Sequence, residues 1–447
     1  MGCCSSGYGA AVTTDLKNKN KLGLPELIAM GVGGMIGGGI FSVLGIAVGI
    51  SGHAAPLAFG LGGLIAMLTG YSYVKLALAF RSDGASFTYL ERAFPGAPSV
   101  AGLMGWLVIV GYVGTLALYS FTFGAYGAEL LSDQGSALTR RVLSVGVLLF
   151  FMIVNLNGVR SSGLMEDLIV YTKILLLTLI GIAGLTSTRR VNLLPVFDQG
   201  VSSVFIAGAM VFVAFEGFQL ITNAVCEADR PERNIPRGIY GSILITSLIY
   251  LVVSFVAVGS MAPEGLIAAK EYALAVAAEP ALGNAGRVLV GIAALLATSS
   301  AINATSFGAS RMMAEMSREE MMPKAFSFRS RSGDVPWFAV VALTGMGVLF
   351  SVFNSLDTIA SFSSLTFLLV SMGVAIANLK LSATTKSSKP LVISGIAVIS
   401  VTIALLLWHL WTSERGTLVD VVTIYIAVIV AELAFSKRRV VFKTKGA

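Results

Sequence analysis

The chain has 447 residues, of which 55% are hydrophobic and only 12% are charged, and its mean hydropathy is +0.84. A soluble domain carries about 25% charged residues, so this composition excludes an ordinary soluble protein and indicates an integral membrane protein. The net charge of +7 would also suit a nucleic-acid-binding protein, but the basic residues lie between apolar runs, which indicates membrane topology instead.

Twelve apolar runs follow one another along the chain. A helix needs about 20 apolar residues to cross about 30 Å of hydrocarbon, and in lipid an open strand would leave its backbone polar groups unpaired. We therefore predict an all-α integral membrane protein with twelve transmembrane helices, at about 24–50, 55–80, 100–131, 140–156, 164–186, 200–226, 237–262, 284–314, 336–354, 357–380, 390–411 and 417–435. The runs at 140–156 and 336–354 are short.

The basic residues indicate the orientation of these helices. If the N-terminus is inside, 22 of the 31 Lys and Arg residues lie in inner segments and 7 in outer ones, and the other two, Lys75 and Lys173, lie within spans. The positive-inside rule then places both termini in the cytoplasm and the protein in the cell membrane as a multi-pass protein.

The start "MGCCSS" matches a myristoylation pattern, but twelve spans make a lipid anchor redundant, so we expect an unmodified flexible tail.

The first span contains "GVGGMIGGGIF", with six glycines in residues 31–41. Glycine costs about 1 kcal/mol against alanine in a helix, so the helix is weakened at its middle. A dinucleotide-binding loop is excluded because Ile36 stands where its third glycine is required. Close helix packing through pairs such as Gly33 and Gly37 is one interpretation, and a broken helix that exposes backbone groups is the other.

The sixth span, "VFVAFEGFQ" at its middle, contains a second interruption at Glu216 and Gly217. Spans one and six correspond if the first ten spans form two halves of five, and interrupted segments at matching positions are the best sequence pointer to a transporter binding site. Spans three and eight, which also correspond, are both long. We therefore favour two broken helices, although packing stays an alternative for the glycines.

Two broken helices offer both poles that a zwitterionic amino acid needs. A half-helix that begins near Gly38 directs N–H groups toward a carboxylate, and carbonyls near Ile36 or Phe215 suit an ammonium group. Phe212, Phe215 and Phe218 would form an apolar lid. The predicted substrate-binding residues are Ile36, Gly37, Gly38, Gly39, Ile40, Phe212, Ala214, Phe215, Glu216 and Gly217.

Three blocks of the chain resemble one known family. "GVGGMIGGGIF", "VFVAFEGFQLITNAVCEADRPERNIPRGI" and "ATSSAINATSFGASRMMAEMSREEMMPKAF" are similar to the first, sixth and eighth helices of the amino acid–polyamine–organocation (APC) superfamily. The likeness covers roughly residues 22–435. It implies the LeuT fold, with a 5+5 inverted repeat plus two C-terminal helices, and secondary transport of amino acids or related amines. Glu216 stands where many members have an apolar residue, and Gln219 where an acid is common.

Lys173 lies in the middle of the fifth span, where a charged side chain costs about 2.5–3.5 kcal/mol on insertion scales and marks a functional site by default. The family resemblance implies that its ammonium reaches the carbonyls near Gly33–Ile36 and the hydroxyls of Ser299 or Ser300, and acts in proton coupling. A structural lysine paired with buried carbonyls is the alternative. For Glu216 three roles stay open, namely binding a cationic substrate, carrying a proton, and capping the broken helix.

The predicted organisation has three parts: a cytoplasmic tail at 1–23, a ten-helix transport core at 24–380, and two additional helices with a short basic cytoplasmic tail at 381–447.

We expect a transporter that imports amino acids with protons, and as alternatives a carrier of polyamines or cationic amino acids, or an exchanger. Membrane lipids are expected partners, and nucleic acid is not. No enzyme constellation, metal-binding pattern or cofactor is predicted, and nothing in the sequence indicates an oligomeric state.

Overall fold

The computed structural model describes residues 21–82, 85–95, 98–131, 136–157, 163–330 and 335–443. Within these ranges the regular elements are helices, with one isolated β-bridge between Leu22 and Ala228. The predicted all-α membrane protein is confirmed. The start "MGCCSS" and most of the predicted N-terminal tail lie outside the described residues.

Helices occupy each of the twelve predicted ranges. In chain order the α-helices are α1 (Leu24–Met35), α2 (Gly39–Ser51), α3 (Ala55–Phe80), α4 (Ala85–Ala93), α5 (Pro98–Leu130), α6 (Ala137–Leu156), α7 (Gly163–Leu185), α8 (Val201–Met210), α9 (Leu220–Asn223), α10 (Pro231–Ser260), α11 (Pro263–Ala269), α12 (Ala273–Arg318), α13 (Trp337–Phe353), α14 (Leu356–Lys380), α15 (Ser382–Thr385), α16 (Lys389–Ser413) and α17 (Arg415–Lys443). Short 3-10 helices include η4 (Val211–Phe215) and η5 (Lys270–Tyr272).

Length and hydropathy make ten helical segments of the described chain suitable for crossing a membrane, and α1 and α13 are shorter apolar helices. The count of twelve crossings stays a prediction. Large apolar side chains are exposed on α6, α7, α16 and α17, such as Leu138 (72% exposed) and Trp408 (65%). In water such surfaces would be unfavourable, and in a bilayer they face the hydrocarbon.

Both predicted interruptions are present. α1 ends at Met35, Ile36 leaves the helical conformation with φ −79° and ψ 69°, and α2 begins at Gly39. In the sixth span α8 passes into η4, and Glu216 is extended (φ −67°, ψ 135°). Gly217 then has φ +134°, which only glycine adopts without strain.

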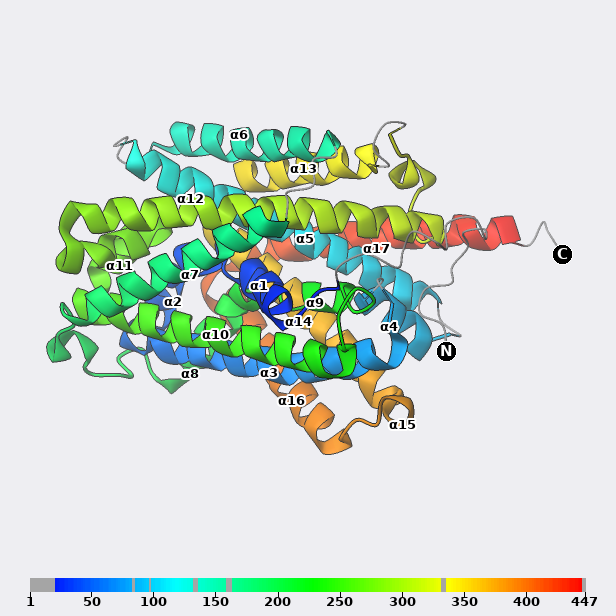
Figure 1. Cartoon of the computed structure of the whole chain (residues 1–447), viewed down its shortest axis with the longest axis horizontal. Coiled ribbons are helices and arrows are strands. Elements are labelled where there is room, and N and C mark those ends of the chain that lie inside the picture. Colours follow the sequence, from blue (N-terminus) through cyan, green and yellow to red (C-terminus); the bar gives the residue numbers. More distant parts are fainter. Residues whose placement is uncertain are drawn as a thin grey trace.

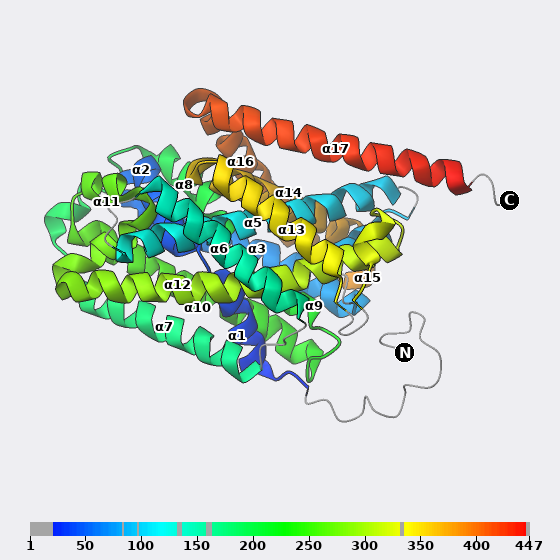
Figure 2. The ribbon, with the colours of Figure 1, turned by 90° about the horizontal axis from the view of Figure 1, so that it is seen from above.

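The two interrupted segments lie at the centre of the bundle. α1 packs against α10, α7 and α12, whereas α2 packs against α8, η4 and α12. Figure 1 shows the long helices α3 and α10 side by side, with α1 and α9 between this pair and α12 in that view. α17 follows one edge of the molecule in Figure 2, where it contacts α5, α14 and α16.

The third and eighth spans are long, as predicted. α5 has 33 residues, and α12 has 46 residues with a kink at Gly283, where φ is +60°. The part of α12 before this kink, together with α11 and η5, forms a helical segment between the seventh and eighth spans. η5 packs against α2, and a side chain at Gly45 would meet the backbone of Lys270.

Candidate functional site

Lys173 of α7 connects three helices at the interruption of the first span. Its side chain is fully buried. Its Nζ donates hydrogen bonds to Gly33 O at 2.8 Å, to Ile36 O at 2.6 Å and to Ser300 Oγ of α12 at 3.3 Å. The structure thus brings Lys173 together with Gly33 and Ser300, two of the residues predicted with it for proton coupling. Their role in coupling stays a prediction.

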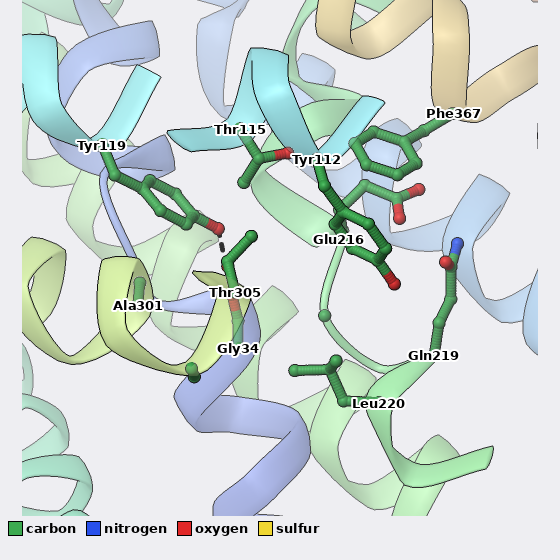
Figure 3. A pocket seen from close by; sticks show the side chains of 12 residues that line it. Gly34, Tyr112, Thr115, Tyr119, Glu216, Gln219, Leu220, Ala301, Thr305 and Phe367 are labelled. Atoms are coloured by element: carbon green, nitrogen blue, oxygen red, sulfur yellow. Dashed lines mark hydrogen bonds between the residues drawn. The ribbon is translucent and has the colours of Figure 1, made fainter. Parts of the chain in front are cut away.

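Two tyrosines bind other carbonyls that the interruptions leave without helical partners. The Tyr250 hydroxyl of α10 lies 2.8 Å from Met35 O and 3.0 Å from Ala214 O, and can donate to either. The Tyr119 hydroxyl of α5 donates to Gly34 O at 3.3 Å, the bond drawn in Figure 3. Tyr250 therefore joins the end of α1 to the end of η4.

Ser364 of α14 forms hydrogen bonds with two backbone groups at the interruption of the sixth span. Its Oγ donates to Met210 O at 2.6 Å and accepts from the Val213 N–H at 3.0 Å. The sequence predicts that carbonyls near Ile36 or Phe215 bind a substrate ammonium group. In the structure Ile36 O and Ala214 O already accept hydrogen bonds from protein side chains, because a buried carbonyl without a partner is costly.

A small pocket of about 20 Å³, enough for about one water molecule, lies beside the two interruptions (Figure 3). Twelve described residues line it: Gly34, Tyr112, Thr115, Tyr119, Glu216, Gly217, Gln219, Leu220, Ala301, Ala304, Thr305 and Phe367. Of the predicted substrate-binding residues only Glu216 and Gly217 are among them. Glu216 is 5% exposed, and its Oε1 has no hydrogen-bond partner.

The glycines around the first interruption are closely covered. A Cβ on Gly37 would lie 2.7 Å from the Tyr119 ring, and one on Gly38 would lie 2.9 Å from Thr122 Oγ1. A Cβ on Gly39 would lie 2.6 Å from Ala214. The segment is therefore both broken and tightly packed, so the two interpretations of these glycines describe the same site.

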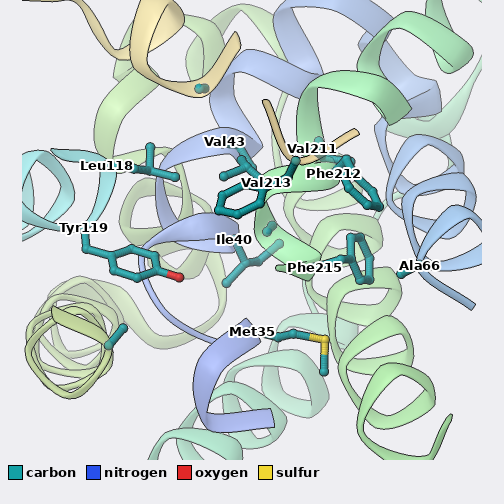
Figure 4. Packing of buried hydrophobic residues seen from close by; sticks show 14 of the residues in the cluster. Met35, Ile40, Val43, Ala66, Leu118, Tyr119, Val211, Phe212, Val213 and Phe215 are labelled. Carbon is teal, nitrogen blue, oxygen red and sulfur yellow. The ribbon is translucent and has the colours of Figure 1, made fainter. Parts of the chain in front are cut away.

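The predicted apolar lid lies in the core of the bundle. Phe212 and Phe215 are fully buried in the hydrophobic cluster of Figure 4. The Phe215 ring packs edge-on against Tyr250 with 5.2 Å between centroids. Phe218 packs in the same way on Tyr73 at 5.6 Å. Ile40 is also buried in this cluster. These side chains do not line the described pocket, and their part in substrate binding stays a prediction.

Sequence reasoning missed most of the pocket lining, although two patterns point to it. Tyr112, Thr115 and Tyr119 are spaced three and four residues apart on α5 and therefore share one helix face. The small residues Ala301, Ala304 and Thr305 do the same on α12. In the described part of the chain no group of three or more His, Cys, Asp or Glu residues could hold a metal ion.

Known proteins resemble this chain over nearly its whole length. Residues 22–431 match the family described as amino acid permease. An uncharacterized protein of Methanocaldococcus jannaschii is 32% identical, over 95% of this chain and 97% of its own. The inner membrane transport protein YbaT of Escherichia coli is 29% identical (94% and 98%), and the branched-chain amino acid permease BcaP of Bacillus subtilis is 24% identical (82% and 83%). The chain therefore belongs to the amino acid permease family of the APC superfamily.

Proposed function

We propose that this protein imports amino acids across the cell membrane by secondary active transport, driven by protons. The family makes amino acids the expected substrates, and the relative BcaP is named as a branched-chain amino acid permease. One observation supports the coupling most directly: the buried ammonium of Lys173 is bonded to Gly33 O and Ile36 O, at the point where α1 is interrupted.

A protonated Lys173 holds the end of α1 against α7 and α12. Loss of the proton removes the positive charge and one donor, so the hydrogen bonds to Gly33 O and Ile36 O weaken and α1 is released. A proton then binds one conformation better than the other, which is the condition for coupling it to alternating access. Burial makes such a change of protonation feasible for a lysine.

The substrate carboxylate has a proposed partner in the first turn of α2. The N–H groups at Gly38 and Gly39 begin a helix and carry the positive end of its dipole. Because Tyr119 covers Gly37 and Gly38 in the structure, it must move before a carboxylate reaches them. Tyr119 also lines the pocket, so it lies between the pocket and the proposed carboxylate site.

We further propose that residues 24–380 form the ten-helix inverted-repeat core, that α16 and α17 are additions to it, and that both termini are cytoplasmic. The distribution of the basic residues supports this orientation. Cysteines placed singly in the 261–283 and 315–330 segments and probed with a membrane-impermeant thiol reagent in whole cells test it. Labelling of the first segment and protection of the second are expected, and the reverse pattern contradicts the orientation.

Transport is tested with the purified protein in liposomes and a panel of labelled amino acids and polyamines, with and without an inward proton gradient. Saturable uptake that the gradient raises above equilibrium, with no sodium present, is expected. Uptake that requires a substrate inside the liposome would show an exchanger instead. Sodium-dependent uptake, or none that the gradient drives, contradicts the proposal.

A further inference from the structure

Glu216 presents an acidic group to the pocket. The residue follows η4 in an extended conformation, and Gly217 then turns the chain away, so the carboxyl side chain stands at the pocket wall (Figure 3). It is 95% buried, with an exposed fraction of 5%, and its Oε1 has no hydrogen-bond partner. A carboxyl oxygen accepts hydrogen bonds, and no donor reaches Oε1.

A second unsatisfied group lies three residues further on. Gln219 is 6% exposed and also lines the pocket, and its Nε2 has no hydrogen-bond partner. Buried polar groups normally have partners, and each exception requires an explanation. Two such groups at one pocket make it a place where a polar ligand would gain hydrogen bonds.

The rest of the described pocket suits a cation. None of its twelve lining residues is Lys, Arg or His, so Glu216 has no basic neighbour among them. Tyr112, Tyr119 and Phe367 contribute aromatic rings, with Tyr112 and Phe367 packed edge-on at 6.0 Å. Aromatic faces attract guanidinium and ammonium groups. The carbonyls at the interruptions, in contrast, are already bonded to Lys173 and Tyr250.

We propose that Glu216 binds the positively charged side chain of the substrate, with Gln219 as a second polar contact. The carrier then prefers amino acids that bear a cationic side chain, such as arginine and lysine, over neutral ones of the same shape. This inference rests on the proposed transport function and specifies its substrate class. A positive charge on the ligand supplies the partner that the buried carboxylate lacks.

Arginine and citrulline test this preference, because the two have nearly the same shape and only arginine carries a side-chain charge. Equilibrium binding of both to the purified full-length protein in detergent is measured, alongside uptake into liposomes. A charged hydrogen-bonded pair supports a preference of about tenfold or more for arginine. Glu216→Gln should remove most of this preference by weakening arginine binding, and Glu216→Asp should keep most of it.

Glu264→Gln is the matched control, since it makes the same chemical change at an exposed position of α11 outside the pocket. It should leave the arginine-to-citrulline ratio unchanged. If Glu216→Gln does not fold, the arginine-to-citrulline binding ratios of the unmodified protein and of Glu216→Asp test the inference instead.

Equal binding of arginine and citrulline by the unmodified protein overturns the inference, as does an unchanged ratio in well-folded Glu216→Gln. A variant that keeps the ratio but loses the pH dependence of uptake would make Glu216 a proton carrier, which also overturns it. Proton-driven uptake without a preference for cations leaves the proposed function intact. Preferential arginine binding without proton-driven uptake contradicts only the proposed function.

Discussion

Replacement of Lys173 by alanine is the sharpest test of the coupling. The substitution removes the donor to Gly33 O (2.8 Å) and Ile36 O (2.6 Å) inside a site where Lys173 itself is fully buried. An unsatisfied buried acceptor costs about 1–3 kcal/mol, so the two carbonyls together cost about 2–6 kcal/mol. Even about 2 kcal/mol changes the ratio of two conformations by a factor of about 30.

We therefore expect Lys173→Ala to abolish accumulation of substrate against a gradient, and to weaken substrate binding because α1 loses its connection to α7. Lys173→Arg should not restore accumulation, since a guanidinium does not lose its proton at accessible pH. The assay is uptake of a labelled substrate by proteoliposomes under an imposed pH gradient, with sodium replaced by choline. Uptake by the unmodified protein should rise as the external pH falls.

Lys75→Ala is the matched control for this experiment. Lys75 is the other lysine within a predicted span, it is only partly buried, and its Nζ donates to Lys386 O at 3.3 Å on the surface of the bundle. Accumulation should persist in this variant. Proton-driven accumulation by Lys173→Ala, or a requirement for sodium in the unmodified protein, would refute the assignment.

Three further substitutions test the interruptions themselves. Gly38→Val places a branched side chain within about 3 Å of Tyr119, so uptake should collapse while the protein still elutes as a folded species, and normal uptake would contradict a role for this segment. Gly217→Ala forces a Cβ into the backbone of Gly34 at φ +134°, so a large fall in melting temperature is expected, and an unchanged melting temperature would refute the geometry. Tyr250→Phe removes the hydroxyl that serves both interruptions and should lower the free energy of unfolding by about 1–3 kcal/mol, measured by thermal denaturation in detergent.

The sequence by itself determined the helices and where two of them break. The length and hydropathy of each run are local properties, and the low helix propensity of glycine acts at the residue where it occurs. This is why α1 ends at Met35, and why η4 ends at Phe215, just before Glu216 and Gly217, as expected. The burial of Lys173 could likewise be inferred from its place in the middle of an apolar run.

Only the tertiary structure decided which groups satisfy the interrupted backbone and which side chains meet at the pocket. The Tyr250 hydroxyl reaches Met35 O across 215 residues of sequence, and neither residue type nor spacing specifies that contact. The chain leaves η4 after Phe215 and is extended at Glu216, so the two side chains point in different directions. For this reason Phe215 packs on Tyr250 in the core, whereas Glu216, its neighbour in sequence, faces the pocket.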